Sequence, residues 1–166
     1  VANKGLFYPV DPSSLGSCFI GGNIAENSGG ARAVKYGVTK DYVLNLEVVL
    51  PNGEIIWTGA NTLKNATGYN LTQLMVGSEG TLGIVTKIVL KLLPKVNHNI
   101  LMLVPFYKAE QACEAVSEIF KAGITPSALE FMERDAIDWS LRYVEGISVA
   151  VKPNHQAHAK NDLLLQ

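Results

Sequence analysis

The apolar positions in the first half of the chain fall into short blocks that predict a small antiparallel sheet. Residues 42–50 and 54–58 are apolar and β-branched, and the Pro-Asn-Gly sequence between them is a strong turn signal, so they predict a hairpin. Residues 84–93 form a longer apolar run that ends before a proline, and its unbroken apolar character predicts a strand buried on both faces. Between these blocks, residues 71–76 predict one helical turn with Asn70 as its N-cap.

The second half of the chain has the pattern of a strand, a helix and a strand. Residues 99–106 and 127–132 predict strands, and residues 108–122 predict an amphipathic helix that ends at a glycine. The apolar stripe of this helix consists of Ala112, Ala115, Val116, Ile119 and Phe120. A further helix is expected over residues 135–144. This order predicts the start of an α+β domain.

Composition changes where the pattern changes. Thirteen of the fifteen glycines lie at or before Gly83, which supports a division into residues 1–94 and residues 95–166. Loops rich in glycine, proline or polar residues are expected over residues 5–15, 31–40, 59–70 and 152–160. Residues 1–5 predict the tail of a helix stopped by glycine, and residues 162–166 the opening of a strand. We therefore expect a fragment of a longer protein.

Residues 20–30, with the sequence IGGNIAENSGG, contain two glycine pairs around a segment that predicts one or two helical turns. Paired glycines indicate positive φ angles or a close approach of the backbone to another group. The free N–H groups of a helix start can bind an anion such as a phosphate, and Asn23, Asn27 and Ser28 could add hydrogen bonds. A plain glycine-rich turn is an equally good interpretation of these residues alone.

A second glycine-rich loop covers residues 77–83, GSEGTLG. It lacks the order of the G-x-G-x-x-G dinucleotide motif, because a strand rather than a helix follows it, and the chain has no P-loop sequence. The loop is typical either of a backbone that runs along a flat ligand or of a turn that leads into a buried strand.

Composition and charge exclude several function classes. The net charge of −1 gives no electrostatic basis for binding nucleic acid or an acidic membrane surface. No apolar run approaches the roughly eighteen residues that a membrane-spanning helix needs. Cys18 and Cys113 fit no zinc or redox spacing, so two buried thiols in a reducing compartment are expected, which favours the cytoplasm.

Other candidate residues have two interpretations each. His98, His155 and His158 lie outside the glycine-rich part of the chain. His155 and His158 flank a loop and could bind a metal, but no third ligand is nearby, so solvated loop histidines are expected. The basic residues Arg32, Lys35 and Lys40 could meet a phosphate or form a solvated loop. The polar group Lys64, Asn65 and Tyr69 could form a site wall or an ordinary connection. The sequence offers neither a paired acid–base spacing nor a Ser-His-Asp set.

Three stretches of the chain together resemble a known family. They are PVDPSS, then GSCFIGGNIAENSGGARAVKYGVTKDYVLNLEVVLPNGEI, then TLKNATGYNLTQLMVGSEGTLGIVTKIVLKLLP. In order and spacing they resemble the FAD-linked oxidases and dehydrogenases of 2-hydroxy acids, of the glycolate oxidase D-subunit and D-lactate dehydrogenase type. The resemblance implies an α+β fold: the second subdomain of a vanillyl-alcohol-oxidase-type FAD-binding domain over residues 1–94, followed by the start of a cap, or substrate, domain.

The resemblance also implies where the cofactor FAD lies. The residues expected near it are Ser14, Gly21, Gly22, Asn23, Asn27, Ser28, Gly29, Gly80, Gly83 and Ile84, with Ile84 towards the adenine end. Phe19 stands where the family usually has a small hydroxyl residue, so a hydrogen bond from that position is absent. The first FAD subdomain and the histidine-rich catalytic motif of the family have no counterpart in this chain, so the catalytic residues are unknown.

The function implied is oxidation of a 2-hydroxy acid, of the D-lactate or glycolate type, by hydride transfer to the flavin. The partners implied are this small-molecule substrate and an unknown electron acceptor, and the oligomeric state is left open. Two alternatives are a non-catalytic flavin-binding or assembly piece, and glycine loops that bind another nucleotide-like ligand.

Overall fold

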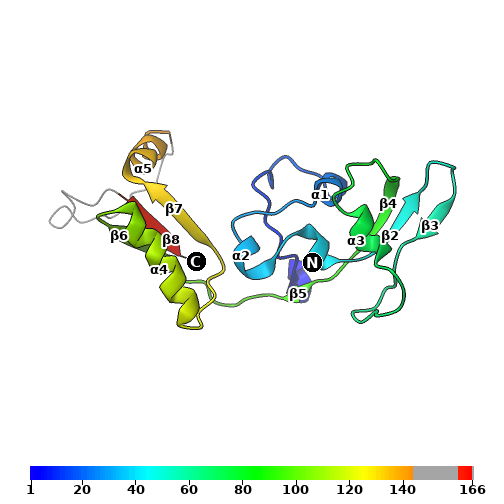
Figure 1. Cartoon of the computed structure of the whole chain (residues 1–166), viewed down its shortest axis with the longest axis horizontal. Coiled ribbons are helices and arrows are strands. Elements are labelled where there is room, and N and C mark those ends of the chain that lie inside the picture. The colour runs from blue at the N-terminus through cyan, green and yellow to red at the C-terminus, as the bar shows by residue number, and fades with distance from the viewer. Residues whose placement is uncertain (144–160, 166) are drawn as a thin grey trace. The chain divides into compact units, whose positions relative to one another are not determined.

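A computed structural model describes residues 1–143 and 161–165 of the chain. It divides into two units, Val1–Asn97 and His98–Gln166, each of which combines short helices with antiparallel strands (Figure 1). This mixture is the α+β class that the sequence predicts.

The first unit is built on a three-stranded antiparallel sheet in the order β3-β2-β4 (Figure 1). Its elements are η1 (Ala2–Lys4), β1 (Leu6–Phe7), α1 (Ile20–Glu26), α2 (Ala33–Tyr36), η2 (Thr39–Tyr42), β2 (Val43–Val49), β3 (Ile55–Trp57), α3 (Leu71–Met75), β4 (Ile84–Leu90) and β5 (Leu93–Pro94). The β2–β3 hairpin confirms the one expected around the Pro-Asn-Gly turn, where Gly53 takes a φ of 86°. The predicted helical turn is α3, and the side chain of Asn70 caps it by accepting a hydrogen bond from the Gln73 N–H at 3.0 Å.

The core of the first unit joins α1, β2 and α3. Leu46 and Val48 of β2 are completely buried, as is Ile24 of α1, and they pack with Met75 and Val76 at the end of α3. Each fully buried aliphatic side chain of this kind contributes about 1.5–3 kcal/mol to stability. The two glycine-rich segments are therefore attached to one packed core.

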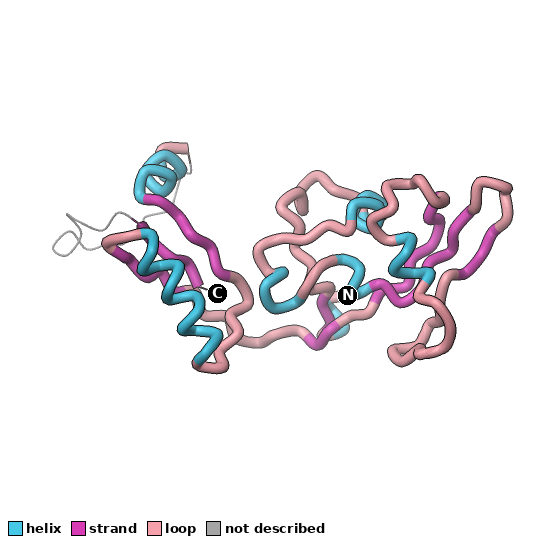
Figure 2. Tube along the Cα trace, in the orientation of Figure 1, coloured by secondary structure: helices cyan, strands magenta, loops and turns pink. Residues whose placement is uncertain are grey.

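Two expectations for the first unit were wrong. β4 is an edge strand, and its residue Ile84 is 68% exposed, so the strand is not buried on both faces. Residues 31–40 contain α2 and the start of η2 rather than a single loop. Residues 5–15 contain no helix, as expected, and their extended backbone includes the short strand β1, which pairs with β5. Residues 59–70 form a loop, as the sequence predicts. Figure 2 shows that loops make up much of the chain between its short helices and strands.

The second unit contains a three-stranded antiparallel sheet in the order β6-β8-β7. Its elements are β6 (Met102–Phe106), α4 (Ala109–Lys121), β7 (Leu129–Glu133), α5 (Arg134–Leu141) and β8 (Asn161–Leu165). All five were expected, although the predicted helix over residues 135–144 begins at Arg134 and ends at Leu141. The loop expected over residues 152–160, with His155 and His158, lies outside the described residues.

The helix α4 buries its predicted stripe only in part. Ala112 is completely buried, while Phe120 is 40% exposed. Gly123, with a φ of 77°, ends the helix as expected. The prediction of two buried thiols was wrong, because Cys18 is half-buried and Cys113 is exposed.

Candidate functional site

The first glycine pair lies inside α1, which begins at Ile20. Neither Gly21 nor Gly22 has a positive φ. A need for positive φ angles, which the sequence suggested for paired glycines, therefore does not explain this pair. A Cβ atom built on either residue has no neighbouring atom within 4 Å. The backbone of α1 is therefore open on this side, and another group can approach it closely.

Backbone hydrogen bonds join α1 to the second glycine-rich loop. α1 ends at Glu26, and the capping residue Asn27 takes a left-handed conformation with a φ of 52°. The Gly77 N–H donates to the Ile24 carbonyl at 2.9 Å, and the Glu79 N–H donates to the Ala25 carbonyl at 3.1 Å. Two segments that lie about fifty residues apart in the sequence are thus held side by side.

A cavity of about 220 Å³ lies where these two segments meet. The residues that line it are Gly21, Ala25, Met75, Ser78, Gly80, Gly83, Ile84 and Val85. Four of them, Gly21, Gly80, Gly83 and Ile84, were predicted from the sequence as site residues. The other four were missed, although Ser78 lies inside the predicted loop and Ala25 lies one helical turn from Gly21.

The two glycines of the second loop have different roles in this cavity. Gly80 has a φ of 76°, and a Cβ built on it has no neighbour within 4 Å. At Gly83, a Cβ would lie 2.6 Å from Cγ1 of Val48 and 2.8 Å from the carbonyl oxygen of Val49. Gly83 is therefore needed for packing against β2, whereas Gly80 leaves space on the side of the cavity.

Four further predicted site residues make contacts within the protein. The Asn23 side chain is buried and donates to Sγ of Cys18 at 3.4 Å. Asn27 Oδ1 accepts from the Lys40 N–H at 2.9 Å, and the Ser28 carbonyl accepts from the Thr39 hydroxyl at 2.7 Å. A Cβ on Gly29 would lie 2.9 Å from Cγ1 of Val38. Asn23 thus ties α1 to the segment before it, and the other three fix the segment that follows α1; none of the four lines the cavity.

The segment before α1 is exposed. The Ser14 carbonyl accepts from the backbone N–H groups of Ser17 and Cys18, at 2.8 and 2.9 Å, while the residue itself is exposed. Phe19 is 85% exposed and occupies the N-cap position of α1 without a side-chain capping bond. Aromatic residues are unusual there, since Ser, Thr, Asp and Asn are preferred.

The basic residues of the first unit do not converge on the cavity. Arg32 Nε lies 3.4 Å from the carboxylate of Asp11, and the Lys35 ammonium lies 5.6 Å from the ring centre of Tyr36. Lys40 instead lines a second, polar pocket of about 240 Å³, which also includes Asn65 and Tyr69. Lys64 does not line it.

Electrostatics give the glycine-lined cavity no acid or base of its own. Burial raises the pKa of the Tyr8 and Tyr42 phenols, and hydrogen bonds from Lys87 and Thr86 lower the pKa of the Glu47 carboxyl. None of these groups lines the cavity. Over residues 1–143 and 161–165, no cluster of three potential metal ligands occurs. Within the same residues, no helix has the length and apolar character to cross a membrane.

The lining of the cavity fits one part of a flat, largely apolar ligand. Apart from the Ser78 hydroxyl, its walls are aliphatic side chains and glycine backbone, with no charged group. Its volume is below the 300–1,000 Å³ that is usual for sites of drug-sized ligands. The described residues thus suit a portion of FAD rather than the whole molecule.

Comparison with protein-family models gives two matches. Residues 1–59 match the FAD binding domain, and residues 95–159 match the C-terminal domain of FAD linked oxidases. A solved structure of alkyldihydroxyacetonephosphate synthase superposes on 99% of this chain with a TM-score of 0.80, at 24% identity and over 31% of its own chain. This similarity shows a shared fold.

Similar curated proteins have related names. The glycolate oxidase subunit GlcD of Bacillus subtilis is 53% identical over 137 residues, which is 82% of this chain and 29% of the relative. A D-lactate dehydrogenase of Anaerostipes hadrus is 46% identical over 134 residues, 81% of this chain and 28% of the relative. The chain therefore spans less than a third of the length of these relatives.

Proposed function

Because the chain belongs to the FAD-linked oxidoreductases, we propose that it is a segment of a flavoenzyme that oxidises a 2-hydroxy acid to the 2-oxo acid. D-Lactate and glycolate are the first substrates to test, since two of the similar proteins are named for them. The observation that carries the proposal is the cavity that joins the two glycine-rich segments.

FAD, when bound, supplies the redox chemistry by accepting the hydride from the carbon that carries the hydroxyl group. The chain's own residues have the simpler task of binding and orientation. Gly21 and Gly80 leave the backbone uncovered for close contact, and Met75, Ile84 and Val85 add apolar walls that exclude water. Gly83 lets the loop pack directly on β2 and so sets the depth of the cavity.

The wider set of cofactor-binding residues is part of the same proposal. We assign direct contact with FAD to Gly21, Gly22, Gly80, Gly83 and Ile84. Support comes from the open space over the first three and from the exposed position of Ile84 beside them. We assign the positioning of this backbone to Asn23, Asn27, Ser28 and Gly29, and leave Ser14 at the approach to α1.

The domain division and the location in the cell are also proposed. A boundary near residues 94–95 agrees with the start of the second family match at residue 95. A reducing compartment such as the cytoplasm is supported by the free thiols of Cys18 and Cys113. The electron acceptor is proposed only as a class, a one- or two-electron oxidant that reoxidises the flavin.

Purification of the full-length protein tests the proposal. We expect flavin absorbance in the purified protein and reduction of a dye acceptor when D-lactate or glycolate is added. Flavin without turnover of any 2-hydroxy acid would instead support a non-catalytic flavin-binding piece. Absence of flavin, even after incubation with FAD, would contradict the proposal and favour another nucleotide-like ligand.

A further inference from the structure

The start of α1 departs from three local preferences of helices within four residues. Phe19 takes the N-cap position, where its side chain can accept no hydrogen bond from the free N–H groups of the helix. Gly21 and Gly22 follow in the first turn, although glycine disfavours a helix. Neither glycine is explained by a positive φ or by close packing within the protein. Such a concentration of unfavourable local choices is typical of a functional site.

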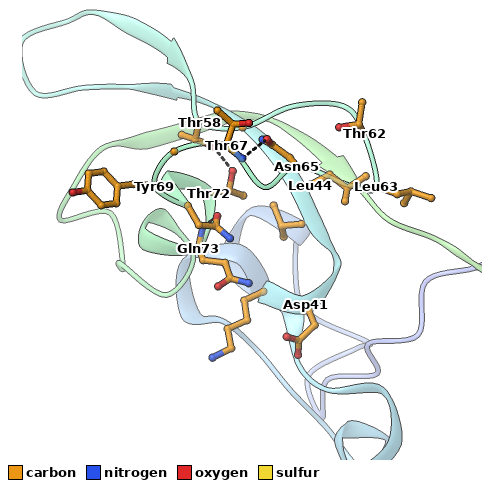
Figure 3. Close-up of a pocket in the computed structure, with 15 residues that line it drawn as sticks. Asp41, Leu44, Thr58, Thr62, Leu63, Asn65, Thr67, Tyr69, Thr72 and Gln73 are labelled. Carbon is orange, nitrogen blue, oxygen red and sulfur yellow. Dashed lines mark hydrogen bonds between the residues drawn. The ribbon is translucent and has the colours of Figure 1, made fainter.

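The side chain of Phe19 is uncovered, at 85% exposure. Exposed aromatic residues are common on protein surfaces, so this alone does not indicate a ligand. Tyr69 is even more exposed, at 95%, and it lines the polar pocket instead (Figure 3). The glycine beside it, Gly68, is explained by its φ of 75°. What distinguishes Phe19 is its position next to a glycine pair that the folded chain itself does not require.

Phe19 lies within reach of this open backbone. Its carbonyl accepts from the Asn23 N–H at 3.1 Å, which fixes Phe19 at the first turn of the helix. Residues three apart on a helix have Cβ positions about 5–6 Å apart, so the Phe19 side chain starts beside the uncovered surface of Gly22. Gly21, between them, lines the cavity. A flat group that covers the two glycines would therefore meet Phe19 at its edge.

We propose that the Phe19 ring packs against a flat heteroaromatic ring of FAD that covers Gly21 and Gly22. The identity of the ligand rests on the proposed function. Aromatic pairs contribute to binding beyond the apolar area that they bury. The resemblance described above implies a small hydroxyl residue at this position, so the contact would be particular to this chain. FAD has two flat rings, isoalloxazine and adenine, and the chemistry of the contact is the same for both.

The test compares FAD binding by the full-length protein and by variants at position 19. Flavin-free protein is titrated with FAD in a calorimeter. Phe19→Leu keeps an apolar side chain but removes the ring, so we expect the affinity to fall roughly two- to tenfold. Phe19→Tyr keeps the ring and should bind FAD as tightly as the parent protein.

Phe19→Ala separates contact with the cofactor from a role in folding. Alanine caps a helix no better than phenylalanine, so the thermal midpoint of the flavin-free protein should not change. The FAD affinity should fall further than in Phe19→Leu, because more apolar surface is lost. If the ring instead packs against another part of the full-length protein, the midpoint of the flavin-free variant should fall, and this result would overturn the proposal.

Trp57→Leu is the matched control. Trp57 is also exposed, at 47%, but it lies on β3, at the opposite edge of the sheet from β4. It does not line the cavity, so its replacement should leave the FAD affinity unchanged. Unchanged affinity in Phe19→Leu and Phe19→Ala, or an equal loss in Trp57→Leu, would overturn the proposal.

The visible absorption spectrum of the bound flavin identifies the ring that Phe19 contacts. A contact with isoalloxazine should give Phe19→Leu shifted absorption bands, whereas weaker binding with an unshifted spectrum assigns the contact to adenine. Dye-linked turnover of D-lactate and glycolate is measured on the same preparations. Weakened FAD binding without turnover in any of them, the parent included, would reject the proposed function and keep the contact. Turnover with unchanged FAD binding by the Phe19 variants would do the reverse.

Discussion

Gly21 offers a substitution whose effects on folding and on flavin binding should have opposite signs. It lies in the first turn of α1, and a Cβ there would contact no atom within 4 Å. Replacing a helical glycine by alanine gains about 0.5–1 kcal/mol, because the unfolded chain loses conformational freedom. We therefore expect Gly21→Ala to raise the thermal midpoint of the flavin-free protein.

The same methyl group should impair cofactor binding. It would extend into the cavity from a position where we propose that the backbone approaches FAD. A misfit of this kind costs about 1–3 kcal/mol in a packed environment, which corresponds to a loss of roughly five- to two-hundredfold in affinity. Gly21→Val, with two more carbons, should retain less flavin than Gly21→Ala.

Gly83→Ala provides the contrast in folding stability, although Gly83 is itself assigned to contact with FAD. Its Cβ would lie 2.6 Å from Val48 and 2.8 Å from the Val49 carbonyl, so we expect a loss of about 1–3 kcal/mol in stability. The assay is thermal denaturation of the flavin-free full-length protein, followed by titration with FAD monitored by flavin fluorescence. The reasoning is refuted if Gly21→Ala destabilises the protein as Gly83→Ala does, or if it binds FAD with unchanged affinity.

Four other predictions concern individual contacts and the chain as a whole. Asn27→Ala should lower the free energy of unfolding by about 1–3 kcal/mol, because alanine is strained at a φ of 52° and cannot accept the hydrogen bond from the Lys40 N–H. Asn27→Gly also loses this acceptor but tolerates the positive φ, so chemical denaturation should show a smaller loss of stability. Asn70→Ala should cost about 1 kcal/mol by removing the α3 cap, and equal stability of variant and parent would contradict that role. The hydrogen bond from Lys87 holds the pKa of Glu47 in the folded protein below its unfolded value near 4.5. The ionised Glu47 therefore stabilises the folded protein above pH 4.5, and this contribution is lost as the pH falls through the lower folded pKa. Thermal midpoints measured from pH 6 to pH 3 should therefore fall less steeply for Glu47→Gln than for the parent protein. The same pH dependence in both proteins would contradict a stabilising role of the Glu47–Lys87 contact. The 166-residue chain made alone should bind FAD weakly and oxidise no 2-hydroxy acid, because its cavity surrounds only part of the cofactor; sub-micromolar affinity in calorimetry would disprove this.

Local sequence signals predicted the elements that depend on neighbouring residues. The β2–β3 hairpin follows from a turn of three residues, and the caps at Asn70 and Gly123 follow from residue type alone. The hairpin and the two caps are each determined by a few neighbouring residues, so the local sequence is enough to predict them.

Features that depend on distant segments were not predictable in this way. Gly21 and Gly30 belong to similar glycine pairs, yet only Gly30 packs against the backbone carbonyl of Asp11. The sequence cannot show which glycine faces another chain segment and which faces open space. The exposure of Ile84 was missed for the same reason, since an apolar run does not reveal that β4 lies at the edge of its sheet.

The pairing of β2 with two strands has a consequence for the order of folding. The hydrogen bond from Leu46 to Thr58 joins residues 12 apart, whereas that from Thr86 to Glu47 joins residues 39 apart. Because contacts between nearby residues form sooner, we expect the hairpin to form within microseconds and β4 to join later. Ile84, on the β4 side of the cavity, takes its place only in that second step. We expect the joining of β4 to limit the folding rate. A flavin that binds after this step would slow unfolding and leave the folding rate unchanged.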